Sequence, residues 1–237
     1  MSNIALALSN VNANYGRAHI LFEVGFEVER GKVLAMLGRN GAGKSTTMKT
    51  IMGLVKSTSG EIKFGDQRIE SEPTYKISRQ GLGYVPEDRR IFTELTVLEN
   101  LQVGIRPPRD GVPRWTTERV FEIFPNLGDM RKRLGSRMSG GEQQMLAIAR
   151  TLMGCPSLVL LDEPSEGLSP VIIENMARTI LTLKAEGLTI VISEQNLHFA
   201  AHIADQAIIL EKGRVRFFGS MKELAANEEI QREYLTA

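Results

Sequence analysis

Residues 38–46 constrain the fold more than any other part of the chain. They begin with a complete GxxxxGK[ST] loop and end at Thr46; in order, the loop is Gly38, Arg39, Asn40, Gly41, Ala42, Gly43, Lys44 and Ser45. A short apolar run over 33–37 precedes the loop, and a helical pattern over 44–54 follows it. Backbone N–H groups and the helix dipole favour an anion where such a loop enters a helix. The context therefore predicts a phosphate-binding loop between a buried strand and a helix.

The residue types in this loop predict how it holds a nucleotide. Gly38, Gly41 and Gly43 let the backbone turn tightly, so that successive N–H groups face the phosphates. Lys44 is expected to contact the β and γ oxygens of ATP, and the Ser45 hydroxyl is expected to bind Mg²⁺.

A second glycine-rich turn lies about a hundred residues further on. Ser139, Gly140, Gly141, Glu142 and Gln143 precede an unbroken helical pattern that ends at residue 150. Alone, such a turn could be a glycine C-cap joined to the next helix. Both turns cannot hold the same nucleotide, so the pair predicts a nucleotide clamped between two protein surfaces.

Two carboxylates follow the apolar run over 158–161. Asp162 and Glu163 end this predicted strand, and ligands bind at the carboxyl ends of strands in parallel sheets. Asp162 is predicted to hold the Mg²⁺ hydration shell, and Glu163 to accept a proton from an attacking water. The alternative is a pair of solvated carboxylates at a strand end.

The remaining pattern predicts an α/β chain with a helical insertion. A strand is expected over 61–64, a buried apolar strand over 189–193, and a hairpin over 207–218 around Lys212-Gly213. Apolar residues between 95 and 155 recur at helical spacing, with an exposed proline-rich loop over 107–113. A short amphipathic helix is expected over 221–234. We predict one domain over 1–237, with a core of about 1–86 and 156–237 and a helical subdomain of about 87–155.

The composition gives no support for a nucleic-acid-binding, membrane-spanning or secreted protein. A net charge of +1 with no long basic run gives no reason to expect a nucleic-acid partner. No apolar run approaches the roughly 20 residues that span a bilayer, and the N-terminus has no secretion signal. The single cysteine, Cys155, precludes an internal disulfide and suits a reducing cytoplasm.

In their order and spacing, these motifs resemble the nucleotide-binding subunits of ABC transporters across essentially the whole chain. The resemblance implies a P-loop NTPase fold with a RecA-like parallel-sheet core, an N-terminal antiparallel β portion and an inserted α-helical subdomain. It also implies ATP hydrolysis with Mg²⁺ in a dimer, in which the signature motif of one subunit reaches the γ-phosphate on the other.

The resemblance assigns a role to further residues. Tyr15 resembles the aromatic residue that stacks on adenine, although it could be an ordinary strand aromatic. Residues 38–46 match Walker A, and Asp162 with Glu163 match Walker B and the catalytic base. The signature motif corresponds to Ser139, Gly140, Gly141, Glu142 and Gln143. Residues 165–169 occupy the D-loop, but depart from its common SALD sequence.

Two positions depart from the usual family pattern. Glu87 stands where the Q-loop usually has glutamine; its carboxylate could bind Mg²⁺ or its water, but adds negative charge beside the γ-phosphate. Gln195 stands where the H-loop usually has histidine; it can hydrogen-bond the γ-phosphate but cannot become a cation. His198 is interpreted as a core or surface histidine, and His19 and His202 carry no site signal.

With these departures, the chain resembles the LivF-type ATPases of branched-chain amino-acid importers. The Q-loop region reads VPE and then RR-x-F-x-x-L-T-V-x-E-N-L, and the H-loop reads EQN. The likeness implies a LivG-like ATPase partner or a second copy as a dimer, two membrane permeases and, indirectly, a periplasmic substrate-binding protein. It implies a peripheral location on the cytoplasmic face of the bacterial inner membrane.

Other functions remain open at this point. Urea or short-amide importers and lipopolysaccharide-type exporters use similar ATPases. A different class is an ATP-binding regulatory subunit that does not hydrolyse ATP, which Glu87 and Gln195 favour and Glu163 opposes. The chain has no room for the coiled-coil insertion or tandem cassettes of soluble ABC ATPases.

Overall fold

A six-stranded sheet forms the centre of the molecule. The computed structural model describes residues 3–235. The strand order is β10-β9-β3-β8-β7-β6, and all neighbours are parallel except β10 and β9, which form the predicted hairpin. The strands are β3 (Val33–Leu37), β6 (Leu82–Val85), β7 (Leu158–Asp162), β8 (Thr189–Glu194), β9 (Gln206–Glu211) and β10 (Arg214–Ser220).

A second, antiparallel sheet covers one end of the molecule. Its order is β2-β1-β4-β5, formed by β1 (Ile4–Tyr15), β2 (Ala18–Glu29), β4 (Ser57–Phe64) and β5 (Gln67–Arg68). Together the two sheets confirm the predicted α/β class with a parallel core and an N-terminal antiparallel portion.

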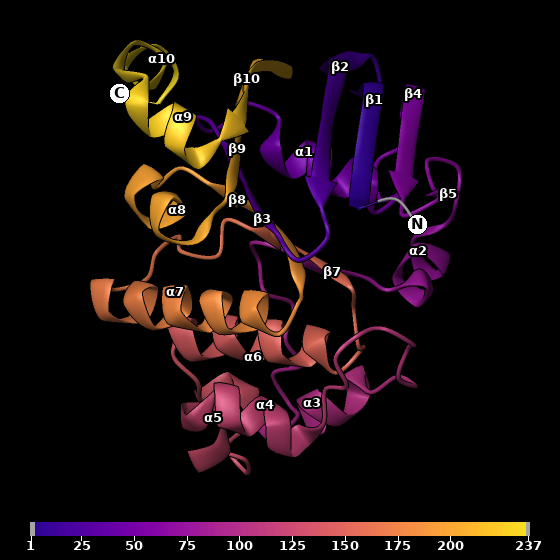
Figure 1. Cartoon of the computed structure of the whole chain (residues 1–237). Helices are drawn as coiled ribbons and strands as arrows, with labels where there is room; N and C mark the ends of the chain where they lie inside the picture. The colour runs from indigo at the N-terminus through magenta and orange to yellow at the C-terminus, as the bar shows by residue number, and fades with distance from the viewer. Residues whose placement is uncertain (1–2, 236–237) are drawn as a thin grey trace.

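Helices cover the parallel sheet and extend the molecule away from the antiparallel sheet. Figure 1 shows α3, α4 and α5 at the end opposite β1 and β2, with α6 and α7 between. The helices are α1 (Lys44–Ile51), α2 (Thr74–Gln80), α3 (Val97–Gly104), α4 (Thr117–Ile123), α5 (Pro125–Asp129), α6 (Gly140–Leu152), α7 (Pro170–Ala185), α8 (Leu197–Ile203), α9 (Met221–Ala226) and α10 (Glu228–Tyr234). No helix within residues 3–235 is long and apolar enough to cross a membrane.

The apolar strands are buried because both faces of the parallel sheet are covered. Every residue of β3 and β7 is buried, as expected for continuous apolar runs in a parallel sheet. Along β3, Val33 and Ala35 pack into the core on the side of the helices α6 and α7. Leu34 and Met36 pack on the other side, with α1 and the antiparallel sheet. The strand that leads into the glycine-rich loop is therefore fixed on both faces.

One local expectation was wrong. The chain over 221–234 forms two helices instead of one, because Asn227 leaves the helical conformation and accepts a hydrogen bond from the Ile230 N–H at 3.1 Å, capping α10. The loop over 107–113 is largely exposed, as predicted, with Pro107 and Pro108 exposed and Pro113 partly buried. Arg109 ties this loop to the core. Its guanidinium donates to the carbonyl oxygens of Cys155 at 2.6 Å and Arg79 at 2.9 Å.

Asn100 fixes the start of α3 against the preceding loop. Its side chain is fully buried and accepts a hydrogen bond from the Phe92 N–H at 2.9 Å. Its amide nitrogen donates to the carbonyl oxygens of Phe92, Leu95 and Thr96. One side chain thus satisfies backbone groups that have little access to water.

We expect Asn100→Ala to lower the free energy of unfolding by about 2–3 kcal/mol, because it leaves the Phe92 N–H unpaired and removes the hydrogen bonds that the buried amide donates to three carbonyl oxygens. Urea denaturation with an unchanged m value would measure the loss. Asn126→Ala is the matched control, since Asn126 is exposed on α5. A change below about 0.5 kcal/mol for Asn100→Ala, the usual range for surface substitutions, would contradict this account.

Candidate functional site

The glycine-rich loop presents the start of α1 without a side-chain cap. Gly43, the N-cap residue, has φ 110°, and no side chain accepts a hydrogen bond from the first turn. Gly38 has φ 148°, and a Cβ there would lie 2.4 Å from the Leu210 carbonyl oxygen. Only glycine therefore fits at residue 38. The result is an uncapped helix N-terminus, which suits an anion such as a phosphate.

A pocket of about 470 Å³ surrounds this loop. Tyr15, half-exposed at the end of β1, forms one wall. The size and lining are compatible with a nucleotide whose base lies on Tyr15 and whose phosphates lie on the loop. The lining residues also include Asn40, Gly41, Ala42, Gly43, Lys44, Ser45, Thr46, Glu87, Glu163 and Glu166.

The Lys44 ammonium is buried within the loop and has three oxygen partners. Its Nζ donates to the carbonyl oxygens of Gly38 at 2.8 Å and Arg39 at 3.2 Å. It also forms an ion pair with Glu163, at 3.0 Å from Oε1. The cation therefore lies between the phosphate-binding loop and the candidate base at the end of β7.

The Asp162 carboxylate accepts hydrogen bonds from three hydroxyl groups. Ser45 Oγ donates to Asp162 Oδ1 at 2.9 Å, and Ser193 Oγ donates to the same oxygen at 2.7 Å. The Tyr84 hydroxyl donates to Oδ2 at 3.0 Å. A serine hydroxyl beside a carboxylate is the oxygen set that Mg²⁺ takes in P-loop proteins. The donor set thus fits Mg²⁺ held by Ser45 and Asp162.

Sequence reasoning missed Tyr84 and Ser193. Both end or nearly end a strand that neighbours β7, so the sheet register alone brings them to Asp162. Burial raises the pKa of Tyr84 far above its usual value, and the charge and hydrogen bond of Asp162 raise it further. The phenol therefore remains a hydrogen-bond donor throughout the physiological pH range.

Gln195 links Glu163 to the glycine-rich loop. Its Nε2 donates to Glu163 Oε2 at 2.8 Å and to Asn40 Oδ1 at 2.8 Å. Burial alone would raise the pKa of Glu163, but the hydrogen bonds from Lys44 and Gln195 and the Lys44 charge outweigh it and lower that pKa. Glu163 is therefore ionised at neutral pH, as a general base must be.

Two further carboxylates lie at the edge of the same pocket. A hydrogen bond with Glu163 raises the pKa of Glu166, and burial and the charges of Glu163 and Glu87 act in the same direction. Glu87 is exposed and lines both this pocket and a smaller one of about 240 Å³ beside Asp162. Glu87 is thus near the candidate Mg²⁺ ligands, although the structure gives it no direct bond to them.

The D-loop is tied to the H-loop by a buried carboxylate that sequence reasoning also missed. Glu194 is 2% exposed and accepts hydrogen bonds from Ser165 N at 3.2 Å and Ser165 Oγ at 2.8 Å. Burial raises the pKa of Glu194. Its position immediately before Gln195 was the available signal, because a polar residue ending a buried strand needs a partner.

The structure places the signature residues apart from the P-loop pocket. Ser139 caps α6 and forms a capping box with Glu142, whose carboxylate accepts a hydrogen bond from Ser139 N at 2.7 Å. Gly140 lies against the Arg89 guanidinium and Gly141 against Ile172. Residues 139–142 are not among the lining residues of the pocket around the P-loop.

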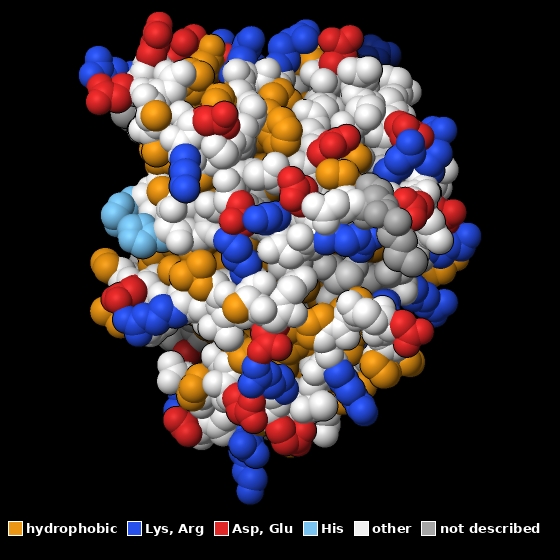
Figure 2. Space-filling model, viewed as in Figure 1, with side chains coloured by type: hydrophobic (Ala, Val, Ile, Leu, Met, Phe, Trp, Pro, Cys, Tyr) orange, Lys and Arg blue, Asp and Glu red, His pale blue; other side chains and the backbone are white. Residues whose placement is uncertain are grey.

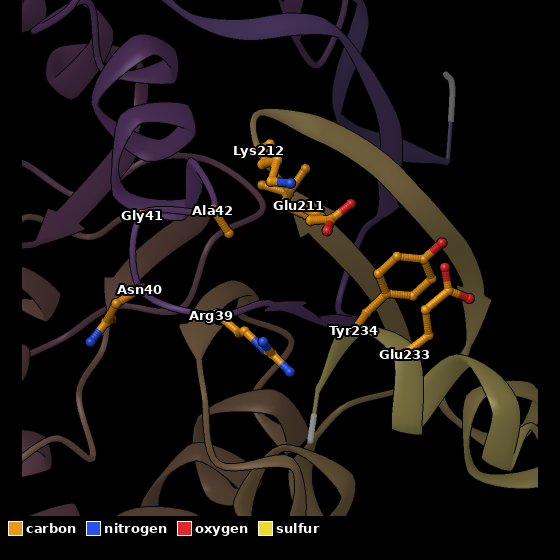
Figure 3. A pocket seen from close by; sticks show the side chains of 9 residues that line it. Arg39, Asn40, Gly41, Ala42, Glu211, Lys212, Glu233 and Tyr234 are labelled. Atoms are coloured by element: carbon orange, nitrogen blue, oxygen red, sulfur yellow. The ribbon is translucent and has the colours of Figure 1, made fainter. Parts of the chain in front are cut away.

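A further pocket of about 250 Å³ shares Asn40, Gly41 and Ala42 with the pocket around the P-loop and is also lined by residues of α10. Figure 3 shows the Arg39 side chain directed toward Tyr234 and Glu233 of α10, whereas Asn40 points away from them. The side chains of Arg39 and Asn40, two neighbouring residues of the glycine-rich loop, therefore point in different directions.

Comparison with known proteins identifies the same family as the sequence motifs. Residues 21–166 match the ABC transporter family. The high-affinity branched-chain amino acid transport ATP-binding protein BraG of Pseudomonas aeruginosa is 39% identical, over 97% of this chain and 99% of its own length. The lipopolysaccharide export system ATP-binding protein LptB of Haemophilus influenzae is 31% identical, over 97% of this chain and 96% of its own.

The fold is likewise that of solved ABC cassettes. An ATP-binding cassette of an ABC transporter, 26% identical, aligns with a TM-score of 0.83 over 98% of this chain and 97% of its own. The predicted resemblance to ABC transporter ATPases, including those of branched-chain amino acid transport, is confirmed.

We expect Tyr84→Phe to raise the Mg²⁺ concentration that half-maximally supports ATP hydrolysis by roughly three- to tenfold, because Asp162 loses a donor that orients it. ATP affinity measured without Mg²⁺ should not change. Tyr75→Phe, at an exposed tyrosine on α2, is the matched control. An unaltered Mg²⁺ dependence in Tyr84→Phe would show that the phenol does not position the carboxylate.

Proposed function

The chain belongs to the ABC transporter family of ATP-binding proteins, and we propose that it energises the import of branched-chain amino acids through partner permeases. Its part in the transporter is that of the ATP-hydrolysing subunit. The observation that carries the chemistry is the convergence of Lys44, Asp162 and Glu163 on one glycine-rich loop.

We propose that ATP binds with its adenine on Tyr15 and its phosphates on residues 38–46. Lys44 would contact the β and γ oxygens, and Ser45 and Asp162 would hold Mg²⁺, with Glu87 close enough to contact its water. When bound, Mg²⁺ neutralises charge on the phosphates as the transferred group separates.

The contacts of Lys44 suggest how ATP binding releases Glu163 from its ion pair with this lysine. A γ-phosphate on the loop competes with Glu163 for the Lys44 ammonium, since both are anions. Glu163 Oε1 then becomes able to accept a proton from water, while Oε2 keeps its bond to Gln195. Gln195 orients the base and places an amide beside the γ-phosphate, but it cannot relay a proton as histidine does.

A second ATPase subunit is needed to complete the nucleotide site. The signature residues 139–142 do not line the pocket around the P-loop of their own chain, and we infer that they contact ATP held by a partner. We propose a LivG-like partner, with a second copy of this chain as the alternative. ATP binding closes the two subunits and hydrolysis lets them reopen, which is a population shift between two states.

We propose that residues 87–155 act as the helical subdomain that couples this cycle to the permeases. A groove of about 310 Å³ lies between α2, α3 and α6. It is lined by Phe92 and Val103, which are 47% and 48% exposed, and by Arg106 and Arg150. These apolar and basic residues suit a permease segment with apolar and acidic side chains. The complex would then lie at the cytoplasmic face of a bacterial inner membrane.

The cargo is inferred from overall likeness, because no residue of this subunit is expected to touch it. The near full-length similarity to BraG supports branched-chain amino acids. The similarity to LptB keeps a lipopolysaccharide-type exporter as the second candidate. Urea and short amides are the further alternatives for an importer.

We expect Lys44→Ala to abolish ATP binding at this P-loop and to stop leucine uptake. The measurement is uptake of labelled leucine by proteoliposomes that contain this chain, its partner ATPase, two permeases and the binding protein. Lys56→Ala, at an exposed lysine shortly after α1, is the control for loss of a lysine. Leucine uptake that persists in Lys44→Ala would contradict the energising role, and ATP affinity that is unchanged would contradict the site.

We also expect Gln195→His to raise ATP turnover at this site, because it supplies the imidazole that most relatives have. Gln195→Ala should lower turnover, since Glu163 loses its amide donor. Single-turnover hydrolysis in the assembled complex, with the partner P-loop inactivated, separates this site from the other. No increase in Gln195→His would count against a site slowed by glutamine.

A further inference from the structure

Two exposed histidines lie one helical turn apart on α8. His198 and His202 are at positions i and i+4, so they share one face of the helix. Their ring centroids are 4.6 Å apart, with the planes at 62°. Figure 2 shows histidine side chains gathered at the surface beside α8. Neither residue lines the nucleotide pocket.

A backbone contact fixes the tautomer of His202. Its Nδ1 lies 3.0 Å from the His198 carbonyl oxygen. Because a carbonyl can only accept, Nδ1 carries the hydrogen, and Nε2 of the neutral ring keeps a free lone pair. Metal-binding histidines commonly show this arrangement, in which the second ring nitrogen donates to a backbone carbonyl and orients the ring.

The spacing of the rings suits a shared metal ion. Metal–nitrogen bonds of about 2.0–2.1 Å place two neighbouring imidazole centroids roughly 4.5–5 Å apart around one ion. The observed 4.6 Å lies in this range.

The helix that carries the pair is held firmly. Phe199, Ala200 and Ile203 of α8 are buried in the core, on the side away from the histidines. Asn196 caps the helix by accepting a hydrogen bond from the Phe199 N–H at 3.0 Å. Two ligands on a packed and capped helix lose little conformational entropy when they bind a metal.

We propose that His198 and His202 form a two-imidazole site for a transition-metal dication such as Ni²⁺, Cu²⁺ or Zn²⁺. Solvent supplies the remaining ligands. Imidazole nitrogens suit these ions, whereas Mg²⁺ takes oxygen ligands. The site is therefore chemically distinct from Ser45 and Asp162, and it does not depend on the proposed cargo.

The test is calorimetric titration of Ni²⁺ into the full chain without a histidine tag or nucleotide, in excess Mg²⁺. We expect one equivalent to bind, and either His198→Asn or His202→Asn to weaken binding by roughly tenfold or more. His19→Asn is the matched control, because His19 is an exposed single histidine on β2 that contacts Asn12. Its Ni²⁺ affinity should equal that of the unaltered chain.

A spectroscopic measurement distinguishes a shared site from two separate ones. Electron paramagnetic resonance of bound Cu²⁺ should show two imidazole nitrogens, and one in either variant. Far-UV circular dichroism confirms that the variants remain folded. Absence of Ni²⁺ binding, or equal Ni²⁺ affinity in the unaltered chain and both variants, would overturn the proposal.

Discussion

The Asp162 carboxylate joins three elements of the structure at one point. Ser45 belongs to α1, Ser193 to β8 and Tyr84 to β6, and all three hydroxyls donate to this one side chain. Asp162 is 1% exposed, so its charge would be very costly without these partners. The ends of three parallel strands and the first turn of α1 are thereby held in a fixed relation. The positions of the glycine-rich loop and of Glu163, the proposed base, depend on that relation.

The base itself sits in a strained backbone conformation. Glu163 has φ 45°, which is unfavourable for a residue with a side chain. Its N–H donates to Ser193 Oγ at 2.9 Å and lies 3.2 Å from the Ser193 carbonyl oxygen. These contacts hold the turn that directs the carboxylate away from β7 and toward Lys44. Strain of about 1–3 kcal/mol that surrounding contacts maintain is common at functional sites.

The parts of the site that were predictable are those built from consecutive residues. The strand, the glycine-rich loop and α1 follow one another in sequence, and Asp162 directly ends a buried run, so local patterns sufficed. Tyr84 and Ser193 were not predictable because their partner lies 78 and 31 residues away. Only the register of β6, β7 and β8 brings them together. The division of the C-terminal segment at Asn227 escaped prediction for a different reason: apolar periodicity continued across a residue that prefers to cap a helix.

Residues 86–90 connect the two phosphate-binding elements within one chain. Glu87 lines the pocket around the P-loop, whereas Arg89 lies against Gly140 at the start of α6. Arg89 and Arg90 have φ 61° and 49°, a conformation that costs each residue about 1–2 kcal/mol. Residues 86–90 therefore place Glu87 beside one glycine-rich turn and Arg89 beside the other, so one short segment of the chain joins the surroundings of the two turns.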